Sequence, residues 1–266
     1  MTNSQKAYPT DLNDTEWCQI AQYMPKPKLI GRPQKYTWRE ILNGIFYVVK
    51  NGCFWRALPH DFPVWQTVYY YFSLFLRNGL LEQMNRVIRE AVREKEGREP
   101  QPSAMIIDSQ SAKSAECGEQ RGYDGNKKIV GRKRNVVVDT LGLVVVAKVT
   151  PANMQDVHAG QQVLSDLAKS PALIGRLQKI FADGAYRGEL VEWVSTELHA
   201  VMEIVLKVED QKGFQVLPKR WVVERTFAWI SRYRRLARDY ERLAATSEAL
   251  IYIAMIRLGL RRLAKT

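Results

Sequence analysis

The feature that most constrains the fold of this chain is a change of apolar pattern near residue 100. From Asp11 to about Arg98, apolar residues recur at helical spacing in segments separated by proline and glycine. After Pro100 the pattern changes to short β-branched runs, at 104–108, 133–139, 143–149, 179–182 and 201–207. We therefore expect a helical domain over residues 1–98 and an α/β domain over residues 99–266.

The order of the elements expected after residue 99 restricts the fold further. Three strands come first, with a hairpin turn at Asp139-Thr140-Leu141-Gly142, and the last two strands alternate with helices. The helices are expected at 157–169, 187–198, 218–239 and 246–263. This order predicts an α/β fold with a mixed five-stranded sheet covered by helices on both faces.

The charge of the chain indicates the kind of partner. The 40 Lys and Arg residues exceed the 28 Asp and Glu residues, and the net charge of +12 favours a polyanion, first of all nucleic acid. An anionic membrane surface is the rival, but the sequence contains no basic amphipathic segment. No stretch approaches the roughly 20 apolar residues that span a bilayer, so we expect no membrane association.

Two aspartates stand directly after apolar runs that read as buried strands. Asp108 follows Met105-Ile106-Ile107, and Asp183 follows Lys179-Ile180-Phe181-Ala182. Ligands of such sheets gather at the carboxyl ends of parallel strands, so both acids are placed for chemistry. Asp139 and Asp156 are assigned to structure instead, because they stand where a hairpin turn and a helix N-terminus favour aspartate.

A third carboxylate is expected from the helix at 218–239. At helical spacing Glu224 lies on a polar and basic stripe, with Arg220 one turn before it, whereas the other faces are apolar. Three converging carboxylates beside a polyanion make sense if they hold two divalent cations, Mg²⁺ or Mn²⁺. On spacing alone a structural alternative is equally open, in which Asp108 and Asp183 cap turns and Glu224 pairs with Arg220.

Six motifs together resemble one family, the DDE transposases of small bacterial insertion sequences of the insertion-sequence-five group. They are Gly31-Arg32-Pro33, Trp55-Arg56-Ala57-Leu58-Pro59, Asp108-Ser109-Gln110-Ser111, Gly131-Arg132-Lys133-Arg134, Asp183-Gly184-Ala185-Tyr186-Arg187 and Arg220-Trp221-Val222-Val223-Glu224-Arg225. The resemblance implies a ribonuclease-H-like core in which Asp108, Asp183 and Glu224 form the catalytic and metal-binding triad with two Mg²⁺ ions. It also implies cleavage at the terminal inverted repeats of an element and joining of the 3′-hydroxyl ends to target DNA.

The helix that carries Glu224 departs from the family pattern. Many relatives have Tyr, Arg, Glu and Lys at fixed spacing, and here Arg220 and Glu224 fit, but Leu217 and Ser231 stand at the Tyr and Lys positions. This puts the phosphate-contact role of the Lys position in doubt and leaves the triad intact. The interval between Asp183 and Glu224 is too short for the large insertion domain of some relatives.

Double-stranded DNA, both element ends and target, is the expected partner. Phosphate contacts are expected from a basic, glycine-bearing loop between the first two strands, from the Glu224 helix and from single basic residues elsewhere: Arg32, Lys113, Lys127, Lys128, Arg132, Lys133, Arg134, Arg187, Arg220, Arg225 and Arg235. The helical domain would read the ends in a helix-turn-helix-like manner, with Trp65–Arg77 as recognition helix, although core packing explains that helix equally well.

Joining two ends implies a homodimer on DNA, in the cytoplasm at the nucleoid, with no small-molecule cofactor. Two rival functions stay open. A metal-dependent nuclease would cut without joining, and a non-catalytic DNA-binding protein would repress related elements.

Overall fold

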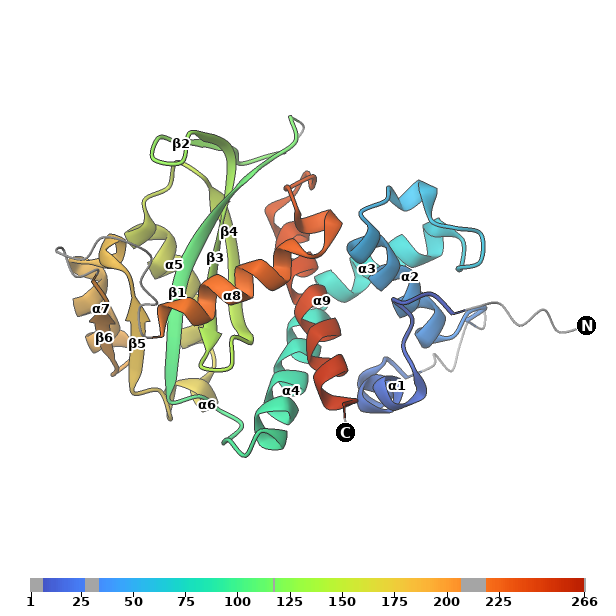
Figure 1. Ribbon diagram of the computed structural model, residues 1–266, viewed down its shortest axis with the longest axis horizontal. Helices are drawn as coiled ribbons and strands as arrows, with labels where there is room; N and C mark the ends of the chain where they lie inside the picture. Colours follow the sequence, from blue (N-terminus) through green and yellow to red (C-terminus); the bar gives the residue numbers. More distant parts are fainter. Residues whose placement is uncertain (1–6, 27–33, 117, 207–218, 266) are drawn as a thin grey trace, which may run out of the picture.

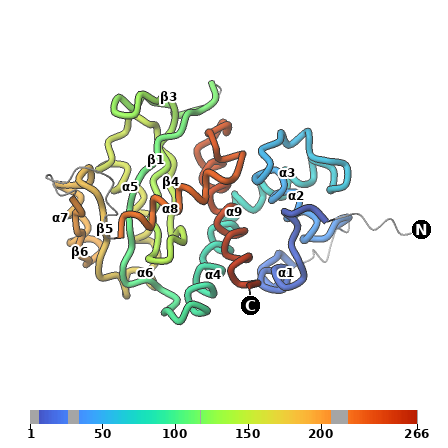
Figure 2. The backbone as a smooth tube through the Cα atoms, in the orientation of Figure 1, coloured from blue at the N-terminus to red at the C-terminus, as the bar shows by residue number. Residues whose placement is uncertain are grey.

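The computed structural model describes residues 7–26, 34–116, 118–206 and 219–265 (Figure 1). Helices at one end of the molecule stand beside a twisted sheet with helices on both faces, as the ribbon and the backbone tube show (Figures 1 and 2). The described chain contains no helix that combines the length and apolar character needed to cross a membrane.

The N-terminal half is helical, as its periodicity predicts. It comprises α1 (Asp14–Ile20), α2 (Trp38–Asn51), α3 (Trp65–Arg77) and α4 (Leu80–Lys95), with short 3₁₀ turns at Ala21–Tyr23 and Trp55–Ala57. Local sequence sets the first two helix starts, because Asn13 with Glu16 and Thr37 with Glu40 form capping boxes. Gly52, at φ 74°, ends α2 in the left-handed conformation that glycine adopts without strain.

The sheet contains six strands within the described residues. They are β1 (Ala104–Lys113), β2 (Gly122–Asp124), β3 (Ile129–Asp139), β4 (Val144–Pro151), β5 (Lys179–Ala182) and β6 (Val201–Ile204). The order is β2-β3-β1-β5-β6, and β4 pairs with β3 at the sheet edge. β1 pairs antiparallel with β3 and parallel with β5, and β5 pairs parallel with β6. The expected mixed sheet with helices on both faces is confirmed.

Helices form a separate layer on each face of the sheet. On one face α5 (Asp156–Ala168) and α7 (Glu189–Glu197) cover a core that includes Met105, Ile107 and Ile180. On the other face α4, α8 (Arg220–Ser231) and α9 (Ala244–Leu263) cover Ile106, Val136 and Val138. Adjacent residues of β1 thus enter different cores, as the alternation of side chains along a strand requires. The short elements α6 (Pro171–Ile174), Gly184–Tyr186 and Arg234–Leu236 complete the fold.

Three boundaries differ from the sequence-based predictions. β1 runs on to Lys113 and β3 begins at Ile129, because the two strands form one long antiparallel ladder, extended by the short β2 that the sequence did not predict. The helix expected over 218–239 is α8, which ends at Ser231 and is followed by a 3₁₀ turn. Residues 207 and 218, the expected ends of a strand and a helix, lie outside the described residues.

The C-terminal helix α9 connects the two halves of the chain. It packs against α4, α2 and α1 as well as against β4. Its buried residues, among them Leu250, Ile253 and Leu260, belong to one apolar core together with residues of α2, α3 and α4. The helical region is therefore completed by the last helix, although the sequence places that helix after the sheet.

Candidate active site

The two aspartates predicted from sequence stand on neighbouring parallel strands. The register pairs Ile106 of β1 with Phe181 of β5, and Asp108 and Asp183 each follow two residues later. Both therefore reach the same level of the sheet. Asp183 comes directly after the last residue of β5, as predicted, whereas Asp108 lies in the middle of the longer β1.

Glu224 lines the same pocket from α8. The pocket has a volume of about 620 Å³, and its lining includes Asp108, Asp183, Glu224 and Arg220. The carboxylate of Glu224 is exposed and has no hydrogen bond or ion pair to the described residues. The structural alternative for Glu224 is wrong, since Arg220 contacts Asp183 instead, with 3.6 Å between Nη2 and Oδ2.

The surroundings of Asp108 disfavour its charged form. Burial of the carboxyl group raises the pKa of Asp108 to about 7, and the charges of Asp183 and Glu224 act in the same direction. The backbone N–H of Ser109 and the charge of Arg220 oppose this shift. A half-buried acid with two acidic neighbours is typical of a site that a cation completes.

Asp183 has two roles in the structure. Its Oδ1 accepts a hydrogen bond from the backbone N–H of Ala185 at 2.9 Å, which caps the turn Gly184–Tyr186. Its Oδ2 is directed toward Arg220. The turn cap and a place in the pocket are therefore compatible, and one does not exclude the other.

Three further polar residues, Ser109, Lys133 and Asp156, line the same pocket. Ser109 Oγ donates to Asp156 Oδ1 at 2.8 Å, and Lys133 Nζ contacts the same oxygen at 3.0 Å. Asp156 is the first residue of α5, and Gln155 rather than Asp156 is the N-cap. Sequence reasoning did not place Ser109 or Asp156 in the site. One signal was available in the sequence. Because side chains alternate along a strand, Lys133 of β3 lies on the face opposite that of Arg132 and Arg134, so a polar partner was to be expected on that face.

Asp139 is structural, as predicted. It is fully buried, and its Oδ1 accepts hydrogen bonds from the backbone N–H groups of Leu141 and Leu143 in the hairpin turn. Its Oδ2 pairs with Arg93 of α4 at 2.7 Å. This aspartate therefore fixes the β3–β4 turn against the helical region.

The carboxylates are not arranged as a preformed metal site. Within the described ranges, no three His, Cys, Asp or Glu side chains are grouped closely enough to hold an ion. The donor set nevertheless fits Mg²⁺ or Mn²⁺, since Asp108, Asp183 and Glu224 line one pocket and supply the hard oxygen ligands that these ions prefer. The pKa of Asp108 is raised mainly by burial, and the charges of Asp183 and Glu224 add to this shift.

The basic residues predicted to contact DNA divide into exposed and buried groups. Those with exposed or half-buried side chains are Lys113, Lys127, Lys128, Arg187, Arg220 and Arg225. Arg32 and its motif lie outside the described residues, as does Leu217. Lys133 is 7% exposed and contacts Asp156, so it lies inside the pocket that the three acids line and not on an outer loop.

The prediction that Arg132, Arg134 and Arg235 contact DNA is wrong. Residues 131–134 belong to β3 and not to a loop, and the side chains of Arg132, Arg134 and Arg235 are only 0%, 1% and 8% exposed. Arg132 pairs with buried Asp239 at 3.3 Å, Arg235 pairs with Glu241 at 2.6 Å, and Arg134 donates to a backbone carbonyl at 2.8 Å. These three arginines therefore have their partners inside the folded protein.

Comparison with known proteins assigns this arrangement to a family. Residues 99–258, which contain Asp108, Asp183 and Glu224, match the family described as transposase DDE domain. The chain belongs to the DDE transposases. Residues 12–85 match a second family, described as putative transposase of the IS4/5 family, which places the transposase in the IS4/5 group. The fold is consistent with the ribonuclease-H-like DDE domain.

One relative extends the comparison. A putative transposase for insertion sequence element IS402 from Burkholderia cepacia is 30% identical over 133 residues, which are 48% of this chain. The matched region spans 60% of the length of that relative. At the level of the family, a DDE domain implies polynucleotidyl transferase or nuclease chemistry.

Proposed function

We propose that this protein is an insertion-sequence transposase that binds terminal inverted repeats, cuts the DNA at the element ends and joins the 3′-hydroxyl ends to target DNA. The observation that carries the proposal is the placement of Asp108 and Asp183 at one level of two adjacent parallel strands, in a pocket that Glu224 also lines. Joining two ends requires at least two copies on DNA, so we expect a homodimer in the DNA complex, acting at the nucleoid in the cytoplasm.

Asp108, Asp183 and Glu224 are the residues that would hold two divalent ions. When bound, such ions lower the pKa of an attacking water or hydroxyl and stabilise the leaving oxygen of a phosphodiester. The protein positions the acids on rigid elements, with Asp108 inside β1 and Glu224 on a helix whose other side is buried in the core. Ser109, Asp156 and Lys133 form the polar floor that supports β1 and α5 beside them.

Arg220 limits the repulsion between the acids and an approaching DNA strand. Its guanidinium group lies 3.6 Å from Asp183 and is half-buried, so it keeps a positive charge at the pocket wall. The exposed Lys113, Lys127, Lys128 and Arg187 supply further positive charge for backbone phosphates. These contacts would position DNA without reading its sequence.

Recognition of the inverted repeats is assigned to the helical region, residues 1–98. On α3, the helix Trp65–Arg77, Val68, Phe72 and Phe75 are buried, so this face packs in the core. Tyr69 and Tyr70 are 45% and 53% exposed. The helix therefore presents an outer face to solvent in addition to its core face. A Tyr69→Ala, Tyr70→Ala double variant should lose preference for the element end over unrelated DNA in a gel-shift assay.

The test of the catalytic proposal is Mg²⁺-dependent cleavage and joining of a DNA fragment that carries the element end. We expect Asp108→Asn, Asp183→Asn and Glu224→Gln each to abolish both reactions while leaving DNA binding in place. The matched control is Glu94→Gln, an exposed acid of α4 outside the pocket, which should react as the unmodified protein does.

The same assay separates the two rival functions. Cleavage without any strand-transfer product would assign the protein as a metal-dependent nuclease. Binding of the end without cleavage, by the unmodified protein as well as by the variants, would assign a non-catalytic repressor of related elements. Activity that survives Asp108→Asn would refute the triad itself.

A further inference from the structure

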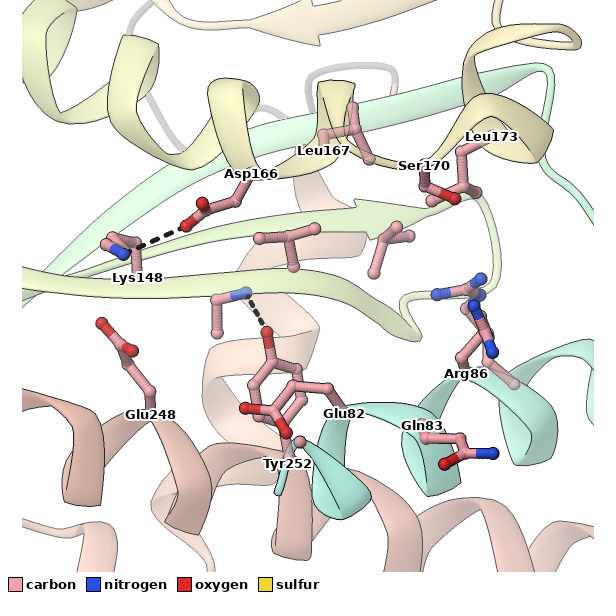
Figure 3. Close-up of a pocket in the computed structure, with 15 residues that line it drawn as sticks. Glu82, Gln83, Arg86, Lys148, Asp166, Leu167, Ser170, Leu173, Glu248 and Tyr252 are labelled. Atoms are coloured by element: carbon pink, nitrogen blue, oxygen red, sulfur yellow. Dashed lines mark hydrogen bonds and ion pairs between the residues drawn. The ribbon is translucent and has the colours of Figure 1, made fainter. Parts of the chain in front are cut away.

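A second pocket lies at the edge strand β4 and shares no lining residue with the catalytic pocket (Figure 3). It has a volume of about 690 Å³ and is lined by α4, β4, α9, the last turn of α5 and α6. The backbone of β4 is already engaged here, because the N–H of Ala147 pairs with the Tyr252 hydroxyl at 3.0 Å. This N–H group is therefore not free to pair with another strand.

Charges of opposite sign gather at opposite ends of this pocket. Arg86 lies beside Ser170 and Leu173 at one end, and Lys148, Asp166 and Glu248 lie at the other (Figure 3). Lys148 and Asp166 form an ion pair at 3.1 Å, so they largely neutralise each other. The arginine end is left with positive charge, whereas Glu248 lies at the other end and Glu82 lies between the two ends beside Tyr252 (Figure 3).

Arg89 gives the arginine end its unusual character. This side chain lines the pocket, is only 2% exposed, and its Nε and Nη2 atoms are buried without a hydrogen-bond partner in the described structure. The ion-pair contact it makes is with Glu90 at 3.8 Å, beyond hydrogen-bonding distance. Most buried guanidinium groups have paired donors, because an unpaired buried charge is costly.

Arg86 makes the buried charge of Arg89 more costly, because Arg86 carries the same charge and stands one helical turn before Arg89 on the same face of α4. Burial lowers the pKa of Arg89, and the charges of Arg93 and Arg86 lower it further, while Asp139 and Glu90 oppose the shift. Two arginines of like charge, one of them with unused donors, form a site that an anion would stabilise.

We propose that the Arg86–Arg89 end of this pocket binds the phosphate group of a small phosphorylated molecule. Guanidinium groups match the oxygens of a phosphate in pairs, and the Ser170 side chain lies at the same end. Glu248 at the other end and Glu82 in the middle of the pocket would repel a polyanion such as duplex DNA but accept hydrogen bonds from amino groups. A nucleotide, with phosphate and amino groups at opposite ends, has this distribution.

The proposal is independent of the transposition chemistry, so it is tested by binding alone. Thermal unfolding of the full chain is measured with inorganic phosphate, with adenosine monophosphate, and with sodium chloride at matched ionic strength. We expect both phosphates to raise the unfolding midpoint by several degrees, the nucleotide at lower concentration, and the salt to have no such effect.

Three variants locate the site. Arg89→Met should weaken phosphate and nucleotide binding at least tenfold without making the free protein less stable, since two of the three guanidinium nitrogens are buried without a hydrogen-bond partner. Arg86 is exposed, and Arg86→Gln should weaken the binding of both phosphates at least tenfold as well. This variant tests the proposal even if Arg89→Met does not fold. Arg77→Gln, an exposed arginine of α3 outside the pocket, should bind as the unmodified protein does.

Three results would overturn the proposal. The first is no stabilisation of the unmodified protein by either phosphate. The second is unchanged binding by both Arg89→Met and Arg86→Gln. The third is loss of binding to a DNA duplex in these variants while neither small phosphate binds, which would make the pocket part of the DNA path.

Discussion

The substitution Asp108→Asn tests the electrostatics of the pocket lined by the three acids without any DNA. Burial and the neighbouring acids raise the pKa of Asp108 from 3.8 to about 7. Between these two values the folded protein binds more protons than the unfolded chain, so the free energy of unfolding falls as the pH rises through this window. Above about pH 7 the buried carboxylate is charged, and the full loss of unfolding free energy is present. Asparagine has the same shape and no charge, so the substitution removes this loss.

The expected magnitude follows from the size of the shift. The pKa of Asp108 rises by roughly three units, and at 1.36 kcal/mol per unit the cost at pH 8 is about 4 kcal/mol as an upper limit. For a chain of this size that corresponds to a rise of roughly 10 °C in the unfolding midpoint. At about pH 5 the free energy of unfolding of Asp108→Asn should exceed that of the unmodified protein by less than about 2 kcal/mol.

The assay is thermal unfolding followed by circular dichroism at both pH values in the presence of a chelator. Addition of Mg²⁺ at pH 8 should then stabilise the unmodified protein more than Asp108→Asn, because the charged carboxylate gains a partner. Glu94→Gln serves as the control and should show neither effect. An Asp108→Asn protein that is no more stable at pH 8, or whose advantage does not depend on pH, would refute the reasoning.

Three further predictions concern the stability of the fold and the lysines expected to contact DNA. Arg93→Met should lower the free energy of unfolding by about 3–5 kcal/mol, because it leaves buried Asp139 without its 2.7 Å partner; a loss below 1 kcal/mol in urea unfolding would contradict this. Gly142→Ala should cost about 1–3 kcal/mol, since φ is +80° and the added Cβ would lie 2.9 Å from a buried hydroxyl oxygen; calorimetry showing no loss would exclude the strain. The double variant Lys127→Gln, Lys128→Gln should reduce the salt slope of DNA binding by about 2, and an unchanged slope would remove these lysines from the interface.

The sequence predicted the parts of the site that depend on local pattern. Asp108 and Asp183 follow apolar runs with strand periodicity, and Glu224 interrupts an apolar helix on one stripe, so each could be found from its own neighbours. Their common pocket depends on the parallel pairing of β1 with β5, which the strand–helix–strand order already favoured.

The parts that failed depend on pairing over long distances. Gly131-Arg132-Lys133-Arg134 has the composition of a solvated loop, and only its pairing with β1 and β4 turns it into buried strand. The partner that neutralises Arg132 is Asp239, which lies 107 positions away in the sequence. Composition reports charge but not which charges meet, so these residues were assigned to DNA.

The packing of α9 on α4 has a consequence for the order in which this protein is made. The core of the helical region includes Leu250, Ile253 and Leu260, which a ribosome adds after the whole sheet. Until those residues emerge, α4 keeps an apolar face without its partner, and the region assigned to end recognition is incomplete. A product that stops after Ser231 would contain Asp108, Asp183 and Glu224 and still lack the helix that packs against both halves. Synthesis of α9, rather than of the segments that carry the three acids, thus decides when the two halves can pack against each other.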